Sequence, residues 1–150
     1  MKWRPMRSSL LLAVLLAACQ KAPPTTPDGT FRVFSDTVRK QDAKTAFTML
    51  SDKSRALLTE RSKTLSAASK GTIKEEPALL SFLSPRRASP LVSISVAKAD
   101  EAKAELDVKL CNQPLDASGA CPAGADVQER VTMVKEAQRW AVELPELVTP

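Results

Sequence analysis

Three cysteines carry most of the reactive chemistry that this sequence offers. Cys19 follows an apolar run near the N-terminus, whereas Cys111 and Cys121 lie ten residues apart in the C-terminal half. The chain contains no histidine, which removes the commonest general base and metal ligand of proteins. Without further soft or imidazole ligands, and without a Cys-x-x-Cys pair, the cysteines do not predict a metal site. We expect no metal and no cofactor.

The first 18 residues have the pattern of an export signal. Residues 10–18 form an uninterrupted apolar run that ends in small residues, and no acidic residue precedes Cys19. The basic residues of this segment are Lys2, Arg4 and Arg7. A basic start, a short apolar stretch and small residues at a cleavage point are typical of a signal peptide. The run has about half of the roughly 20 residues that a membrane-spanning helix needs, so it is too short to remain as an anchor.

The end of this segment, Leu16-Ala17-Ala18-Cys19, resembles the lipobox of bacterial lipoproteins. That resemblance implies that the Cys19 thiol receives a diacylglyceryl group, that the signal is cleaved before it, and that the new amine is acylated. Several acyl chains would anchor the protein permanently in a membrane. Gln20 stands where lipoproteins retained in the inner membrane often carry Asp, which favours the outer membrane, facing the periplasm. The alternative is an ordinary cleaved signal that carries a cysteine.

Export would place Cys111 and Cys121 in an oxidising compartment, where disulfides form and persist. We therefore predict a disulfide between them; free thiols and a redox pair are the alternatives. The loop that the bond closes has about ten residues, which corresponds to about 2.7 kcal/mol on the loop-entropy description.

Ser95-Val96-Ala97-Lys98 matches the Ser-x-x-Lys motif of serine β-lactamases and penicillin-binding proteins. In those proteins the motif opens a helix and has Ser-Asp-Asn and Lys-Thr-Gly partners, which this chain lacks. Here it falls in an expected strand, where an odd separation points the two side chains to opposite faces. We interpret the match as a coincidence.

The charge balance argues against nucleic-acid binding. Removal of Lys2, Arg4 and Arg7 reduces the 22 basic residues to 19, against 17 acidic ones, and lowers the net charge from +5 to +2. A nucleic-acid-binding domain would show a concentrated basic face. The basic residues of the middle segment are interpreted as solvated, with a surface for anionic envelope polymers as the alternative; they include Lys53, Arg55, Arg61, Lys63, Lys70, Lys74, Arg86 and Arg87.

The mature chain is long enough for one small domain. Residues 19–27 are rich in proline and predict an extended tether, residues 28–144 the domain, and residues 145–150 a tail. Helices are expected over 30–40 with Asp28 as N-cap, around Ala46 to Leu50, from Ser51 or Asp52 to about residue 70, and after Glu76-Pro77. Strands are expected around Val92 to Val96, Ala102 to Leu110, Val127 to Val134 and Trp140 to Leu144, with a loop over 112–126. Helices followed by a meander of strands predict an α+β fold, with N-terminal helices packed on a sheet of about four antiparallel strands.

Two segments resemble small lipoproteins with the nuclear transport factor 2-like, or cystatin-like, fold. At the start these are Phe34, Val38, Gln41-Asp42, Ala46-Phe47 and Leu50, and at the end Val131 to Glu136 with Trp140-Ala141-Val142. The resemblance implies a curved antiparallel sheet wrapped around a helix, a cone whose mouth can hold a ligand. The glycine usual in the last turn is replaced here by Ala137-Gln138, so we expect a longer turn.

The expected core is aliphatic and aromatic: Phe31, Phe34, Val38, Phe47, Leu50, Val92, Ile94, Leu106, Val108, Val131, Met133, Trp140 and Val142. The chain lacks the Tyr and His that enzymes of the resembled family use. Its acids are expected at caps, turns and outward positions: Asp42, Asp52, Glu60, Asp100, Glu101, Glu105, Asp107 and Glu143. We therefore expect a membrane-anchored periplasmic lipoprotein that is not an enzyme and that binds a small apolar ligand or an envelope protein. The alternatives are an accessory or scaffold subunit with a filled cone, and a cryptic isomerase- or dehydratase-like enzyme with an acid buried in the cone.

Overall fold

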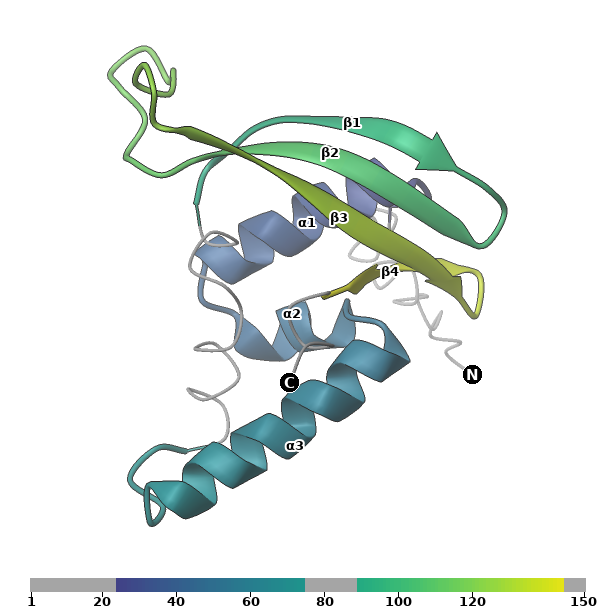
Figure 1. Cartoon of the computed structure of the whole chain (residues 1–150), viewed down its shortest axis with the longest axis vertical. Coiled ribbons are helices and arrows are strands. Elements are labelled where there is room, and N and C mark those ends of the chain that lie inside the picture. Colours follow the sequence, from purple (N-terminus) through teal and green to yellow (C-terminus); the bar gives the residue numbers. More distant parts are fainter. Residues whose placement is uncertain (1–23, 75–88, 145–150) are drawn as a thin grey trace, which may run out of the picture.

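A computed structural model of the chain describes residues 24–74 and 89–144. Its elements are α1 (Pro27–Arg39), α2 (Ala43–Thr48), α3 (Asp52–Ala68), β1 (Leu91–Ala99), β2 (Lys103–Cys111), β3 (Asp126–Glu136) and β4 (Arg139–Glu143). Figure 1 shows a curved sheet with the three helices on one side of it. The predicted α+β class, with N-terminal helices on an antiparallel sheet of four strands, is confirmed. The predicted signal peptide, Cys19, the helix expected after Glu76-Pro77 and the tail lie outside the described residues.

The sheet is a meander with the order β1-β2-β3-β4, and every neighbouring pair is antiparallel. Its register sorts the side chains onto two faces. Leu106 stands opposite Val131, and Met133 stands opposite both Ala104 and Val142, so these residues share the face toward the helices. Asp107 stands opposite both Ser95 and Arg130 on the outer face. The alternation of apolar and polar residues along the strands therefore separates a core face from a solvated face.

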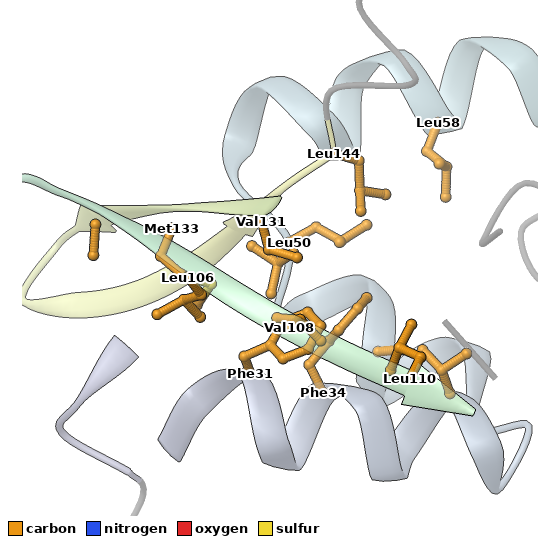
Figure 2. Close-up of a cluster of buried hydrophobic side chains, with 14 residues drawn as sticks. Phe31, Phe34, Leu50, Leu58, Leu106, Val108, Leu110, Val131, Met133 and Leu144 are labelled. Carbon is orange, nitrogen blue, oxygen red and sulfur yellow. The ribbon is translucent and has the colours of Figure 1, made fainter. Parts of the chain in front are cut away.

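The core lies between α1 and the sheet. Phe31, Phe34 and Val38 recur at helical spacing and form the buried stripe of α1. Figure 2 shows the two phenylalanines close to side chains of β2 and β3, including Leu106 and Val108. The rings of Phe31 and Phe34 are tilted by 41° with centroids 5.9 Å apart, a favourable geometry for an aromatic pair.

The segment between α2 and α3 covers the β4 edge of the sheet. Leu50 forms an isolated parallel bridge with Val142. The backbone N–H of Ser51 donates to the carbonyl oxygen of Val142 at 2.9 Å. The backbone N–H of Val142 donates in turn to the carbonyl oxygen of Met49, also at 2.9 Å. This short stretch therefore pairs with β4 as a fifth strand would.

Two local predictions about how elements begin and end are wrong. Thr26, not Asp28, is the N-cap of α1: its hydroxyl accepts a hydrogen bond from the Gly29 N–H at 3.3 Å, and Pro27 takes the first helical position. The turn between β3 and β4 is not longer than usual, because Glu136 pairs directly with Arg139. Instead Ala137 and Gln138 both adopt left-handed φ values, 45° and 67°, as a two-residue hairpin turn requires.

The predicted core is correct for most residues and wrong for Val92. Val92 is 42% exposed. It is the extra residue of a register shift between Leu91 and Ser93, so it has no partner on β2 and drops out of the alternation that buries Ile94. Phe47, Ile94 and Trp140 are only partly buried, although they pack against the core. The buried residues that the predicted core set omits include Leu58, Ala104, Leu110 and Leu144.

Candidate functional site

The sequence-predicted sites at the cysteines fall in two places. Cys19 lies outside the described residues, so its lipidation stays a prediction. Cys111 ends β2, and the structure places its sulfur 2.09 Å from that of Cys121, with the Cα atoms 5.7 Å apart. This pair is at disulfide distance and ties the base of the loop between β2 and β3.

That loop projects beyond the end of the sheet (Figure 1). The Asp116 carboxylate holds its tip by accepting hydrogen bonds from the backbone N–H groups of Ser118 and Ala120, at 2.8 and 2.9 Å. The Ser118 hydroxyl also donates to this carboxylate, at 2.6 Å, and these bonds keep the pKa of Asp116 below its ordinary value. Leu115 is 39% exposed on the loop. The loop is therefore a projection whose tip is held by its own hydrogen bonds.

The interior of the cone is the place where a ligand would be expected. Large side chains fill it between α1 and the sheet: Phe31, Phe34, Leu106, Val108 and Met133 are each at most 1% exposed. Figure 2 shows side chains of α1, β2 and β3 meeting there. Among the described residues this space is therefore packed as a core, as the scaffold hypothesis requires.

The outer face of the sheet carries a shallow polar groove of about 500 Å³. Arg130 crosses it and donates to the Asp107 carboxylate from Nε at 3.0 Å and from Nη2 at 2.8 Å. This pairing raises the pKa of Arg130 further above its ordinary value. Lys109 pairs with Asp126 at 2.9 Å, which lowers the pKa of Asp126. Because these charges neutralise one another in the open, the groove offers little net attraction to a charged ligand.

Ser95 of the Ser-x-x-Lys match lines this groove, and the predicted orientation of the Ser95 and Lys98 side chains is wrong. Ser95 stands opposite Asp107 and Lys98 opposite Glu105, because a register shift after Val96 inserts one extra residue. Both side chains therefore belong to the outer face. Ser95 and Lys98 are also both exposed, whereas an activated serine requires a base positioned in hydrogen-bond reach and sheltered from water.

The acidic residues are placed largely as predicted. Glu105 and Glu143 are half-buried, whereas the others of the predicted set, Asp42, Asp52, Glu60, Asp100, Glu101 and Asp107, are exposed. Asp42 caps α2 by accepting from the Thr45 N–H at 3.0 Å. Hydrogen bonding with the Thr45 side chain, followed by this backbone bond, lowers the pKa of the Asp42 carboxyl. A lowered pKa favours the charged form, the opposite of a carboxyl prepared to donate a proton.

Two acids whose placement in the fold is specific are absent from the set predicted from the sequence. Both carboxylate oxygens of Glu136 accept from the Asp52 N–H, each at 3.1 Å, at the start of α3. Glu129 is half-buried and stands opposite Val108, on the side of the sheet that faces the core. For Glu129 the signal was available, since it occupies an inward position of the alternation between Val127 and Val131.

Within residues 24–74 and 89–144, no group of three or more Cys, Asp or Glu side chains could hold a metal ion. In the same ranges, no helix has both the length and the apolar character needed to cross a bilayer.

No family model matches the chain, and no curated protein matches it. Among solved structures, it is similar to a crystal structure of a protein from Campylobacter jejuni described as an NTF2-like transpeptidase. The two chains are 13% identical, the alignment covers 79% of this chain and 98% of the other, and the TM-score is 0.42. The fold assignment rests on this chain's own elements: an α+β domain with a curved four-stranded antiparallel sheet over helices. This is the class of architecture that the sequence resemblance implied.

Proposed function

We propose that this protein is a lipid-anchored protein of the bacterial envelope whose single domain acts through its surface, as an interaction or scaffold domain, and not by catalysis. The observation that carries the proposal is the filled interior. Phe31 and Phe34 of α1 meet Leu106 and Met133 of the sheet, and each is at most 1% exposed. A domain whose interior is packed has its outer surface left for binding.

The burial of polar groups also supports an interaction role. The described residues that are both polar and buried are Thr30, Ser35, Thr37, Ser51, Ser54 and Ser62. None of these is ionisable near neutral pH, and none is a carboxyl with a displaced pKa of the kind that catalytic acids have. Among the described residues, the acid that the enzyme alternative would use is Glu129, which is half-buried on the core side of β3.

The proposed anchor follows from the lipobox-like Leu16-Ala17-Ala18-Cys19. The tether that follows Cys19 contains Pro23 and Pro24, and α1 begins at Pro27. A proline-rich segment of this kind stays extended and holds a domain away from a surface. The domain is thus proposed to work close to the periplasmic face of the outer membrane.

The anchor is tested by growing cells with labelled palmitate and separating membranes from soluble protein. The wild-type chain is expected to carry the label and to sediment with the membrane. Cys19→Ala is expected to lose both, and Cys111→Ala is the matched control because it removes a different thiol. Label that survives Cys19→Ala would contradict the anchor.

The role of the domain is tested by native and denaturing mass spectrometry of the detergent-purified chain. A filled interior predicts no small molecule beyond the covalent lipid. A copurifying molecule that is lost on denaturation, and whose binding is weakened by Glu129→Gln, would replace the proposal with the ligand-binding or enzyme alternative.

A further inference from the structure

The charges of the domain are divided unequally between its helices and its sheet. Residues 24–74, which form the helices, include ten basic and five acidic residues, whereas residues 89–144, which form the sheet, include six basic and nine acidic ones. The formal charge is therefore +5 on the helical side and −3 on the sheet side. Residues 75–88 add two basic and two acidic residues, so they do not alter this asymmetry. The near-balance of the whole chain hides the division.

The positive charge is most concentrated toward the end of α3. Residues 61–74 contain no acid and four basic residues, namely Arg61, Lys63, Lys70 and Lys74. In Figure 1, α3 is the element farthest from the sheet. Lys63 follows the buried Leu58 by five residues, a separation that places it on the far side of the helix from the core. The last turn of α3 contains no basic residue, so attraction to the helix dipole does not account for this group.

The lysines of this group are exposed and lack counter-ions. Lys63, Lys70 and Lys74 are all exposed, and none of them forms an ion pair within residues 24–74 and 89–144. By contrast, Lys53 at the start of the same helix pairs with Glu143 at 3.4 Å. Like charges that are gathered without counter-ions attract an anionic surface.

The proposed anchor brings such a surface within reach. Seven residues separate Cys19 from Pro27, the first residue of α1. The eight steps from one to the other span at most about 28 Å. The chain therefore enters the domain through the helical side, and a domain held this close meets the membrane surface at a high effective concentration.

We propose that the helical side docks on the anionic lipid headgroups of the membrane that holds the Cys19 lipid, with Lys63, Lys70 and Lys74 against phosphate groups. Each basic residue close to an anionic membrane favours binding by about fivefold. The group thus adds a second attachment to the lipid anchor. The negatively charged sheet side turns away from the membrane, so docking presents the outer face of the sheet to protein partners.

This inference rests on the anchor proposed above and specifies how the anchored domain is oriented. Palmitate labelling is checked on the same preparation. A chain that carries palmitate and does not dock would overturn the inference alone, whereas a chain without palmitate fails the separate test of the anchor.

The test measures how fast each lysine reacts with a water-soluble acetylating reagent, read by mass spectrometry. The acylated full chain is added to preformed vesicles of phosphatidylcholine, either pure or mixed with phosphatidylglycerol. We expect the anionic vesicles to slow labelling of Lys63, Lys70 and Lys74 about threefold or more. Lys98 and Lys103, exposed on the β1–β2 hairpin, are internal controls and should keep their rates. Salt at about 1 M should abolish the protection, because the Debye length falls to about 3 Å.

Matched charge reversals separate the helical side from total charge. Lys63→Glu/Lys70→Glu should abolish the protection of Lys74, whereas Lys98→Glu/Lys103→Glu, with the same change in net charge, should retain it. Circular dichroism checks that both variants fold. Equal protection on pure and anionic vesicles, or equal effects of the two variants, would overturn the proposal. Protection that requires added peptidoglycan instead of anionic lipid would overturn it in favour of an anionic polymer.

Discussion

The Ser54 hydroxyl accepts a hydrogen bond from the backbone N–H of Leu144, 90 residues later in the chain, at 3.0 Å. Ser51 Oγ donates to the same Ser54 oxygen at 3.0 Å and accepts from the Ser54 N–H at 3.2 Å. Both serines are at most 1% exposed. The first turn of α3 is thus fastened to the end of β4 by a buried hydroxyl pair that also caps the helix.

Ser54→Ala is expected to lower the free energy of unfolding by about 2 kcal/mol, because it leaves the buried Leu144 N–H without its acceptor. Chemical denaturation measures the effect. Ser66→Ala, at a half-buried position of the same helix, is the matched control and should change stability by about 0.5 kcal/mol or less. Equal effects of the two substitutions would show that the Ser54–Leu144 bond contributes nothing specific.

Replacing Ser35 by alanine is expected to raise the stability of the fold, whereas replacing Ser54 lowers it. Ser35 lies on the buried stripe of α1 and is 2% exposed. Its hydroxyl oxygen is the buried side-chain polar atom, among the described residues, that lacks a hydrogen-bond partner. Ser35→Ala removes an unsatisfied group and introduces a better helix former, so it should raise the free energy of unfolding by about 1 kcal/mol. The same denaturation experiment tests this, and a loss of stability would mean that the hydroxyl has a partner in solution.

The β3–β4 turn stores strain that substitution can relieve. Ala137 and Gln138 both have left-handed φ values, which cost non-glycine residues roughly 1 kcal/mol or more each. Ala137→Asn/Gln138→Gly introduces the pair that two-residue hairpin turns favour, and should raise the melting temperature by about 4 °C. Ala102→Gly, in the other hairpin at a residue without a left-handed φ, is the control and should lower it. A melting temperature unchanged or lowered by the double substitution would contradict this account.

The sequence predicts the parts of this fold that depend on local periodicity. Phe31, Phe34 and Val38 share one face of a helix because of their spacing, and Leu106 and Val108 alternate with charged residues along β2. The proximity of Cys111 and Cys121 was predictable because the N-terminal segment predicts export, and few other roles fit two thiols in a chain that has no histidine and is predicted to be exported.

What the sequence does not predict depends on contacts between distant segments. Val92 has the pattern of a core residue but is the extra residue of a register shift between Leu91 and Ser93, and the alternation of the strand does not signal that shift. Ser95 and Lys98 share a face only because of a bulge. The Ser54–Leu144 bond spans most of the domain, and no periodicity signals it.

The Cys111–Cys121 pair gives a prediction for the oxidised chain. Without reductant, neither thiol of the pair should react with an alkylating agent, and the intact mass should be that of the oxidised form. Cys111→Ala/Cys121→Ala should lower the free energy of unfolding by about 2.7 kcal/mol, because the unfolded chain regains the freedom of the loop. Alkylation of both thiols in untreated protein would show that the bond does not form.

The pH dependence of stability should include a contribution from Asp100. Its carboxylate accepts hydrogen bonds from the backbone N–H groups of Ala102 and Lys103, at 2.8 and 2.7 Å. These bonds, with a smaller contribution from the positive charges of Lys98 and Lys103, hold the pKa of Asp100 below its ordinary value of 3.8. Because the folded pKa is below the unfolded one, this stabilisation is fully present above the unfolded pKa and is lost as the pH falls through the folded pKa.

Asp100→Asn removes the charge while it keeps the size of the side chain. The variant should be less stable than the wild type near pH 7, and the difference should shrink as the pH falls below about 4, where the wild-type carboxyl takes up a proton. Denaturation curves from about pH 7 to about pH 2 measure the difference. Glu101→Gln, which removes the neighbouring carboxyl on the same exposed turn, is the control and should cause a smaller loss at neutral pH. A difference between Asp100→Asn and the wild type that stays constant over the whole range would contradict the coupling, because a charge-dependent bond must weaken when its acceptor is protonated.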